Sequence, residues 1–393
     1  MESKTHDNTT LEWLLTAALG VAVFCYWGYI APYLIVGRES LQLLICDADT
    51  LTTRLAEPGG LARYLGESLI QLFRYVSAGA VALAVLAVVV QRLSWQLIRE
   101  TVGGWTGYLL SMVPSLLLTW ADSDIDTPLT LHIAVLLVLA LLALVPRRFD
   151  LVLLPVGYWL TGPAVGLLLV RHWRKPVMLA GLAVLLVAST VVSSRLVSYP
   201  LRRVALGIDY RMPEPGKMGT REEMAYDYLL RCKDWDAIIQ RASRDEPQTL
   251  ALQNVVRLAK WYRGQLSEEE LKECLHHTNR VLTSTVAAEI MSDVYMHLRM
   301  LSMSQRASFE VMESLPDGNK SARAMQRQVE TCLASGQYEL ALKYIGLLEQ
   351  TLMYRGWAHE MRLLAEHPER ISQHPVYGPL QEVWKQTVNV YFI

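Results

Sequence analysis

Apolar residues dominate the chain before Leu201, whereas charged residues are concentrated after it. A helix needs about 20 mostly apolar residues to cross the hydrocarbon core of a bilayer. Six stretches approach that length, at 11–36, 77–90, 103–120, 129–145, 151–170 and 177–192. The pattern therefore predicts an all-α chain with a multi-pass transmembrane domain of about six spans over residues 1–203.

The fifth apolar stretch is the least regular of the six. It contains Pro155, Gly162 and Pro163, and these residues interrupt the backbone hydrogen bonds that a helical span needs. Two hypotheses stay open. The stretch either crosses the membrane as a fifth span or is re-entrant and returns to the side on which it began.

Orientation follows from the arginines and lysines of the short loops, which favour the cytoplasmic side. With the N-terminus inside, the inner loops carry Arg92, Arg99, Arg147, Arg148, Arg195, Arg202 and Arg203, and the outer loop carries Asp122, Asp124 and Asp126. Six spans then place the C-terminal domain in the cytoplasm. Arg171, Arg174 and Lys175 count against this orientation, because six spans place them on the outer side of the membrane. A re-entrant fifth stretch removes that disagreement and sends the C-terminal domain outside.

Residues 38–75 form the longest polar segment between two predicted spans. Apolar residues recur there at helical spacing, at Leu41, Leu44, Ile45, Ala48, Leu51 and Leu55, which is typical of an amphipathic helix lying on a membrane surface. Pro58, Gly59 and Gly60 then break the helix. A second helix is expected from Leu61, running straight into the second span.

The chain after Arg203 reads as soluble and helical. Residues 204–219 contain Pro213 and Pro215 and are predicted to be a flexible linker. Residues 220–393 show a degenerate repeat of about 34 residues, the period of tetratricopeptide helix pairs. The clearest unit is 322–348, where Gly336 separates two helical patterns. An irregular helical bundle is the alternative.

Composition narrows the possible functions. A net charge of −1 with scattered basic residues argues against nucleic-acid binding. The five cysteines form no CxxC pair, so reduced thiols are expected. We expect no cofactor, because the sequence contains no phosphate-binding glycine loop and no zinc signature. His132, inside an apolar span, is expected to make an interhelical contact.

Four acids of the first loop could carry chemistry: Glu39, Asp47, Asp49 and Glu67. In a polytopic glycosyltransferase that uses a polyprenyl phosphate, one such acid would act as general base or metal ligand, with Arg38 or Arg63 facing the phosphate. The simpler interpretation is that the acids form the wet face of an interfacial helix. We favour that interpretation and assign no catalytic residue.

The chain also resembles a family of uncharacterised polytopic membrane proteins from the Bacteroidetes, classed as a domain of unknown function. The resemblance rests on Glu39, Gln42, Leu43, Pro58, Gly59, Gly60, Leu61, Tyr64, Leu65, Glu67, Gln71, Phe73, Tyr158, Trp159, Gly162, Tyr226, Asp227, Leu229, Asp234, Trp235, Ile238, Asn319, Lys320, Ser321, Gly336, Tyr338, Tyr344, Thr351, Leu352, Tyr354, Arg355, Trp357 and Ala358. It implies the inner membrane of a Gram-negative cell and brings no activity with it.

The leading hypothesis is an integral inner-membrane scaffold or assembly factor of the cell envelope. Its helical-repeat tail would bind a protein partner, because stacked helix pairs create surfaces suited to peptides and helices. The alternative is the glycosyltransferase-like enzyme, and a transporter ranks behind both.

Overall fold

The computed structural model describes residues 2–99, 101–277 and 279–386, and every regular element in those ranges is helical. The all-α prediction is confirmed there. The chain forms two compact units, each built from separated pieces of sequence. Unit 1 contains residues 1–35 and 47–213, and unit 2 contains residues 36–46 and 214–393. The boundary between the first two pieces falls within α2 (Pro32–Leu41).

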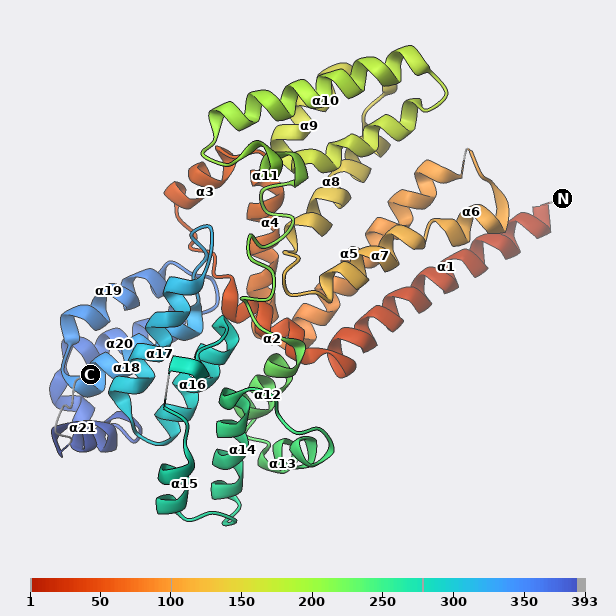
Figure 1. The fold of residues 1–393 in the computed structure, drawn as a ribbon. Helices are drawn as coiled ribbons and strands as arrows, with labels where there is room; N and C mark the ends of the chain where they lie inside the picture. The colour runs from red at the N-terminus through yellow and green to blue at the C-terminus, as the bar shows by residue number, and fades with distance from the viewer. Residues whose placement is uncertain (1, 100, 278, 387–393) are drawn as a thin grey trace. The chain divides into compact units, whose positions relative to one another are not determined.

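Unit 1 contains the long apolar helices α1, α5 and α10, which can be followed in Figure 1. After α1 (Glu2–Cys25) and η1 (Tyr26–Ile30), its elements are α3 (Ala48–Leu55), α4 (Gly60–Ile70), η2 (Gln71–Arg74), α5 (Val76–Ile98), α6 (Gly104–Leu110), α7 (Val113–Asp122), α8 (Thr130–Leu144), η3 (Arg147–Phe149), α9 (Asp150–Thr161), η4 (Gly162–His172), α10 (Pro176–Leu196) and α11 (Leu201–Leu206).

Four stretches of the described chain are long and apolar enough to cross a membrane: Thr10–Ile30, Val76–Ile98, Arg147–His172 and Pro176–Leu196. The shorter helix Thr130–Leu144 is also apolar. The expected span 103–120 is divided into α6 and α7 at Ser111 and Met112. The second span begins at Val76, after η2, so α4 does not run straight into it as predicted.

Buried hydrogen bonds between side chains connect α1 with α5, and α5 with the break between α6 and α7. Thr16 Oγ1 donates to Gln91 Oε1 at 3.0 Å, and Gln91 Nε2 donates to Ser111 Oγ at 3.0 Å. Further along, His132 Nδ1 lies 2.5 Å from Asp122 Oδ2, which agrees with the predicted interhelical contact of His132. Such pairs satisfy polar groups that have no water to bind in an apolar bundle.

The fifth apolar stretch is folded back on itself. Arg171 Nη1 lies 2.9 Å and His172 Nε2 2.6 Å from the carboxylate of Asp150. In a straight helix these positions would be roughly 30 Å apart at 1.5 Å per residue. The turn is at Gly162, whose φ is +71°, a value that residues with a side chain rarely adopt. Elements α9 and η4 therefore form the hairpin that the re-entrant hypothesis requires.

The two ends of unit 1 differ in charge. We call the end that holds Asp122, Asp124 and Asp126 the acidic end. The opposite end, called the basic end, holds Arg99, Arg147, Arg148, Arg171, Arg174 and Lys175. The hairpin begins and finishes at the basic end, because Arg171 Nη2 donates to the carbonyls of Leu142 and Val145 at the end of α8.

Unit 2 is a succession of helices, most of which pack against the next one along the chain, while α14 packs against α16 and α18 packs against α21. They are α12 (Arg221–Arg231), α13 (Trp235–Arg244), α14 (Leu250–Tyr262), α15 (Glu268–Cys274), η5 (Asn279–Val281), α16 (Thr285–His297), α17 (Leu301–Ser314), α18 (Ala322–Ser335), α19 (Tyr338–Glu349), α20 (Arg355–Glu366), η6 (Pro368–Gln373) and α21 (Tyr377–Gln386). Gly336 ends α18 with φ +81°, so the predicted break at this glycine is confirmed. The tetratricopeptide-like assignment itself stays a prediction.

The predicted linker is anchored at its ends rather than free. In unit 1, the Met212 amide donates to the Asp126 carbonyl at 2.7 Å. In unit 2, the amides of Thr285 and Val286 donate to the carbonyls of Lys217 and Met218. The division between the two units falls after Pro213, inside the predicted linker, and the linker assignment stays a prediction.

Candidate functional site

Residues 36–46, the start of the first loop, form part of the helical array of unit 2. We call them the docked segment. Helix α2 ends at Leu41, and residues 42–46 have no regular secondary structure. The predicted interfacial helix from Arg38 to Leu55 is therefore wrong as one element. Its apolar positions do not share one surface, because the helical period is interrupted at Gln42.

The docked segment is held by its backbone and by one apolar anchor. The Leu43 amide donates to the Lys320 carbonyl at 2.9 Å, and the Cys46 amide donates to the Gln350 carbonyl at 2.8 Å. The Leu43 side chain is 6% exposed and lies in the same buried cluster as Leu301 and Ala322. Full burial of a leucine stabilises a fold by about 1.5–3 kcal/mol.

Polar side chains of the docked segment are also paired inside unit 2. The Tyr354 hydroxyl donates to Glu39 Oε1, and Ser40 Oγ donates to Glu289 Oε2 at 2.9 Å. Gly37 lies against α12, where an added Cβ would be 3.3 Å from Met224 Sδ. The docked segment therefore follows the edge of the array at which α12, α16, α18 and α20 begin.

A buried ion network lies beside the docked segment and joins α12, α16 and α18. Arg323 Nη2 lies 2.8 Å from Asp227 Oδ1, Arg323 Nη1 lies 3.2 Å from Glu289 Oε2, and Arg323 also pairs with Asp293. Arg327 Nη2 binds the other oxygen of Asp293 at 2.6 Å. Sequence reasoning missed this network, because its members are far apart in the chain and form no local motif.

Burial raises the pKa of both acids of α16, Glu289 and Asp293, but the charged neighbours of the two acids differ. Burial raises the pKa of Glu289, and Arg323 only partly opposes it. Burial also favours the neutral form of Asp293, but Arg323 and Arg327 outweigh it and hold the pKa of Asp293 below its ordinary value. The neighbouring arginines therefore favour the charged form of Asp293 more strongly than that of Glu289.

The four acids predicted as site candidates do not form one cluster. Glu39 lies in unit 2, whereas Asp47, Asp49 and Glu67 lie in unit 1. Asp47 caps α3 by accepting from the Thr50 amide at 2.7 Å, and Asp49 lies in the first turn of that helix. A cap of this kind satisfies a backbone donor that the helix leaves free. Their chemistry stays an untested prediction.

Glu67 is buried between two arginines, which supply the partner that an acid next to an apolar span needs. Arg54 Nε lies 3.1 Å from Glu67 Oε2, and Arg63 Nε lies 2.8 Å from Glu67 Oε1. Arg63 also reaches Asp209 Oδ1 at 3.1 Å. Burial opposes the charge of Arg63, but Asp209 and Glu67 outweigh it and raise the pKa of Arg63. Arg63 is thus already balanced by protein carboxylates.

The predicted break at Pro58, Gly59 and Gly60 is confirmed and meets the tip of the hairpin. Gly59 has φ +86°, and its amide donates to the Trp159 carbonyl at 2.8 Å. A Cβ at Gly60 would lie 1.8 Å from the Arg54 carbonyl oxygen. No side chain fits there without moving the backbone, so this turn requires glycine.

Within the described residues, no group of three or more histidine, cysteine, aspartate or glutamate side chains is placed to hold a metal ion. The chain matches the sequence model of a family of unknown function, DUF6057, over residues 8–392. The chain belongs to this family. No curated protein and no solved structure matches it.

Membership of DUF6057 confirms the predicted resemblance to a domain of unknown function along nearly the whole chain. Among the residues that carry that resemblance, Glu39 accepts a hydrogen bond from the Tyr354 hydroxyl, and the Leu43 amide donates to the Lys320 carbonyl.

Proposed function

We propose that this DUF6057 protein is an integral inner-membrane scaffold whose helical array binds a protein partner. The observation that supports the proposal is the docked segment itself. The array already holds a partly extended stretch of polypeptide through two backbone hydrogen bonds and a leucine anchor. Consecutive helix pairs bind peptides and helices in this manner.

The array also has apolar side chains that its own core does not use. Phe309, Leu352, Leu363 and Val376 are between 43% and 60% exposed. Aromatic and leucine side chains of this kind are the usual anchors of a protein interface. Single exposed apolar residues are common, so the experiment must test individual positions.

We further propose that the array lies on the outer side of the membrane. At the acidic end, residues 47–75 and the chain after α10 carry arginines, but the short turn between α7 and α8 carries none. The short loops at the basic end carry Arg99, Arg147, Arg148, Arg171, Arg174 and Lys175. The positive-inside rule then assigns the basic end to the cytoplasm. The chain leaves unit 1 beside Asp126, at the acidic end. This proposal replaces the cytoplasmic location expected from six spans.

The enzymatic alternative receives less support. A polyprenyl-phosphate glycosyltransferase would need an available acid in the first loop, with Arg38 or Arg63 facing the phosphate. Glu39 is paired with Tyr354, and Glu67 is paired with two arginines. Asp49 is the exposed acid of the four, and it belongs to no group of three or more potential metal ligands among the described residues.

Photocrosslinking in native membranes tests the scaffold proposal. A benzoylphenylalanine placed at Phe309, Leu352 or Leu363 of the full-length protein should yield a discrete protein adduct. The control is the same probe at Lys217, an exposed position outside the array helices. No adduct at any array position, or an equal adduct at Lys217, would contradict the proposal.

Cysteine labelling tests the sidedness. Cys232 and Cys274 are exposed in unit 2. A membrane-impermeant maleimide should label them in spheroplasts, whereas a Lys175→Cys variant should react only after lysis. Labelling of Lys175→Cys in intact spheroplasts, with Cys232 protected, would restore the six-span topology.

A further inference from the structure

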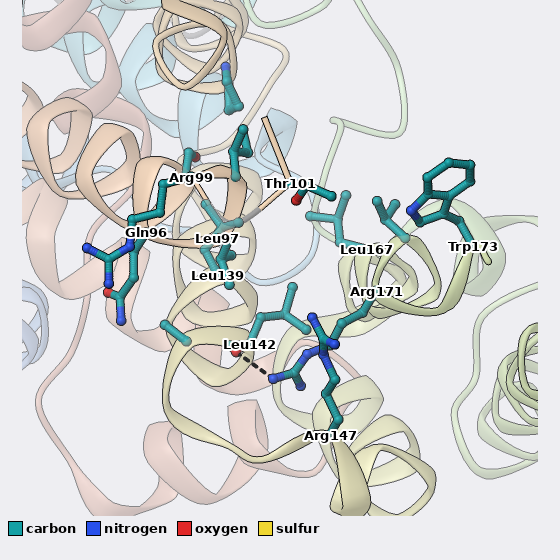
Figure 2. A pocket seen from close by; sticks show the side chains of 15 residues that line it. Gln96, Leu97, Arg99, Thr101, Leu139, Leu142, Arg147, Leu167, Arg171 and Trp173 are labelled. Atoms are coloured by element: carbon teal, nitrogen blue, oxygen red, sulfur yellow. Dashed lines mark hydrogen bonds between the residues drawn. The ribbon is translucent and has the colours of Figure 1, made fainter. Parts of the chain in front are cut away.

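A cavity of about 470 Å³ opens at the basic end of unit 1, between the ends of α5, α8 and η4 (Figure 2). Part of its wall is apolar and includes Leu97, Leu139, Leu142, Leu167 and Val170. Apolar walls with a few polar groups are typical of sites for small amphiphilic molecules. None of the described residues that line this cavity is acidic.

Three arginines line the cavity, and they differ in how their charge is balanced. Arg171 pairs with Asp150 and donates to two carbonyls at the end of α8, so its role is to hold the hairpin against α8. Arg99 and Arg147 are exposed, and neither has an ion pair with any residue that the structure describes. Two positive charges at one apolar cavity favour an anionic ligand.

A polar group inside the cavity is also without a partner. Ser94 is 2% exposed and lines the cavity, and its Oγ has no hydrogen-bond partner among the described atoms. A buried hydroxyl without a partner is unfavourable by about 1–3 kcal/mol. A ligand oxygen that reached Ser94 would satisfy it.

We infer that this cavity binds the phosphate-bearing headgroup of an anionic membrane phospholipid. Arg99 and Arg147 would contact the phosphate, the apolar wall would pack against the first acyl carbons, and Ser94 would donate to an ester oxygen. The location supports a lipid source for the phosphate. Basic pockets between transmembrane helices on the cytoplasmic side are known to suit such headgroups.

The charge requirement can be measured on the full-length protein in nanodiscs. Nanodiscs that mix phosphatidylglycerol with phosphatidylcholine should yield protein with bound phosphatidylglycerol by native mass spectrometry. Arg99→Gln and Arg147→Gln should each weaken retention about fivefold, since one basic residue near a membrane surface contributes about 1 kcal/mol. The double variant should lose about 25-fold on the same basis.

Arg148→Gln is the matched control, because Arg148 is exposed at the same end but lies over the Phe149 ring and does not line the cavity. It should retain phosphatidylglycerol as the unaltered protein does. An equal loss in Arg148→Gln would overturn the inference, since the basic end would then attract anionic lipid without a defined site.

Two further measurements test the cavity and the source of the phosphate. Ala143→Phe, which fills the wall without changing charge, should abolish retention in protein that elutes and unfolds normally. Unchanged retention would overturn the inference. Inorganic phosphate at millimolar concentration should not displace the lipid, and displacement by it, or equal retention of phosphatidylcholine, would equally overturn it.

Discussion

Residues 36–46 and 47–75 follow each other in one loop, yet they belong to different units. The first part is held by contacts that are distant in sequence, such as those of Leu43 with Lys320 and of Glu39 with Tyr354. The second part is held mainly by local features, namely the Asp47 cap, the glycine turn and the pairing of Glu67 with Arg54 and Arg63. The two parts of the loop are similar in composition, but the first belongs to the helical array and the second forms a locally stabilised part of unit 1.

Removing the docked segment from unit 2 should have the largest effect. Residues 214–393 alone lose the Leu43 anchor, two backbone hydrogen bonds and the partners of Glu289 and Tyr354. Together these contribute about 5 kcal/mol, which lowers the melting temperature by at least about 10 °C. Circular dichroism should show this against a chain in which residues 36–46 are joined to 214–393 by a flexible linker. Equal melting temperatures would show that the array folds without the segment.

Asp293→Asn tests the ion network beside the docked segment. Removing one charge of a buried pair is destabilising by about 3–5 kcal/mol, because Arg323 and Arg327 both use this carboxylate. The folded pKa of Asp293 is depressed, so its contribution is present above the unfolded pKa of about 3.9 and is lost as the pH falls below it. The variant should therefore lose less stability than the original chain on acidification.

Glu289→Gln is the matched control for that prediction. Burial raises the folded pKa of Glu289, so any stability that this shift contributes is present at low pH and is lost as the pH rises through the folded pKa. The amide should therefore destabilise unit 2 less than Asp293→Asn at neutral pH. A larger loss of stability from Glu289→Gln than from Asp293→Asn would contradict the conclusion that the charge of Asp293 contributes more than that of Glu289.

Leu43→Ala should destabilise the linked form of unit 2 by about 2–4 kcal/mol, since it removes a buried anchor and leaves a cavity. Leu352→Ala is the control, because Leu352 is 60% exposed, and surface changes are usually within about 0.5 kcal/mol. Both values can be measured by urea unfolding. Equal effects would mean that Leu43 is not a core residue of the array.

The second part of the loop should tolerate conservative changes. Asp47→Asn keeps an oxygen that can cap α3, and Asp49→Asn changes an exposed side chain, so each should alter stability by less than about 0.5 kcal/mol. A complementation assay at matched protein level should show normal function. Loss of function in stable protein would favour the glycosyltransferase alternative.

Local signals in the sequence were enough to predict the helical class, the Pro58–Gly60 break and the helix pair around Gly336. Periodicity could not reveal that helix α2 ends at Leu41, because the apolar spacing continues at Leu44 and Ile45, which belong to unit 2 and follow α2 without helical structure. The α9–η4 hairpin could be predicted only as an alternative. Its turn depends on Gly162, but its closure depends on Asp150 with Arg171 and His172, which are distant in sequence.

Hydrogen–deuterium exchange on the full-length protein in nanodiscs tests the central claim most directly. Residues 42–46 have no helix of their own, so only their bonds to Lys320 and Gln350 can protect the amides of Leu43 and Cys46. The account predicts that two amides of a peptide covering 42–46 exchange as slowly as the amides of α18. Exchange of that peptide within seconds, as in an exposed loop, would contradict the assignment of the docked segment to the array.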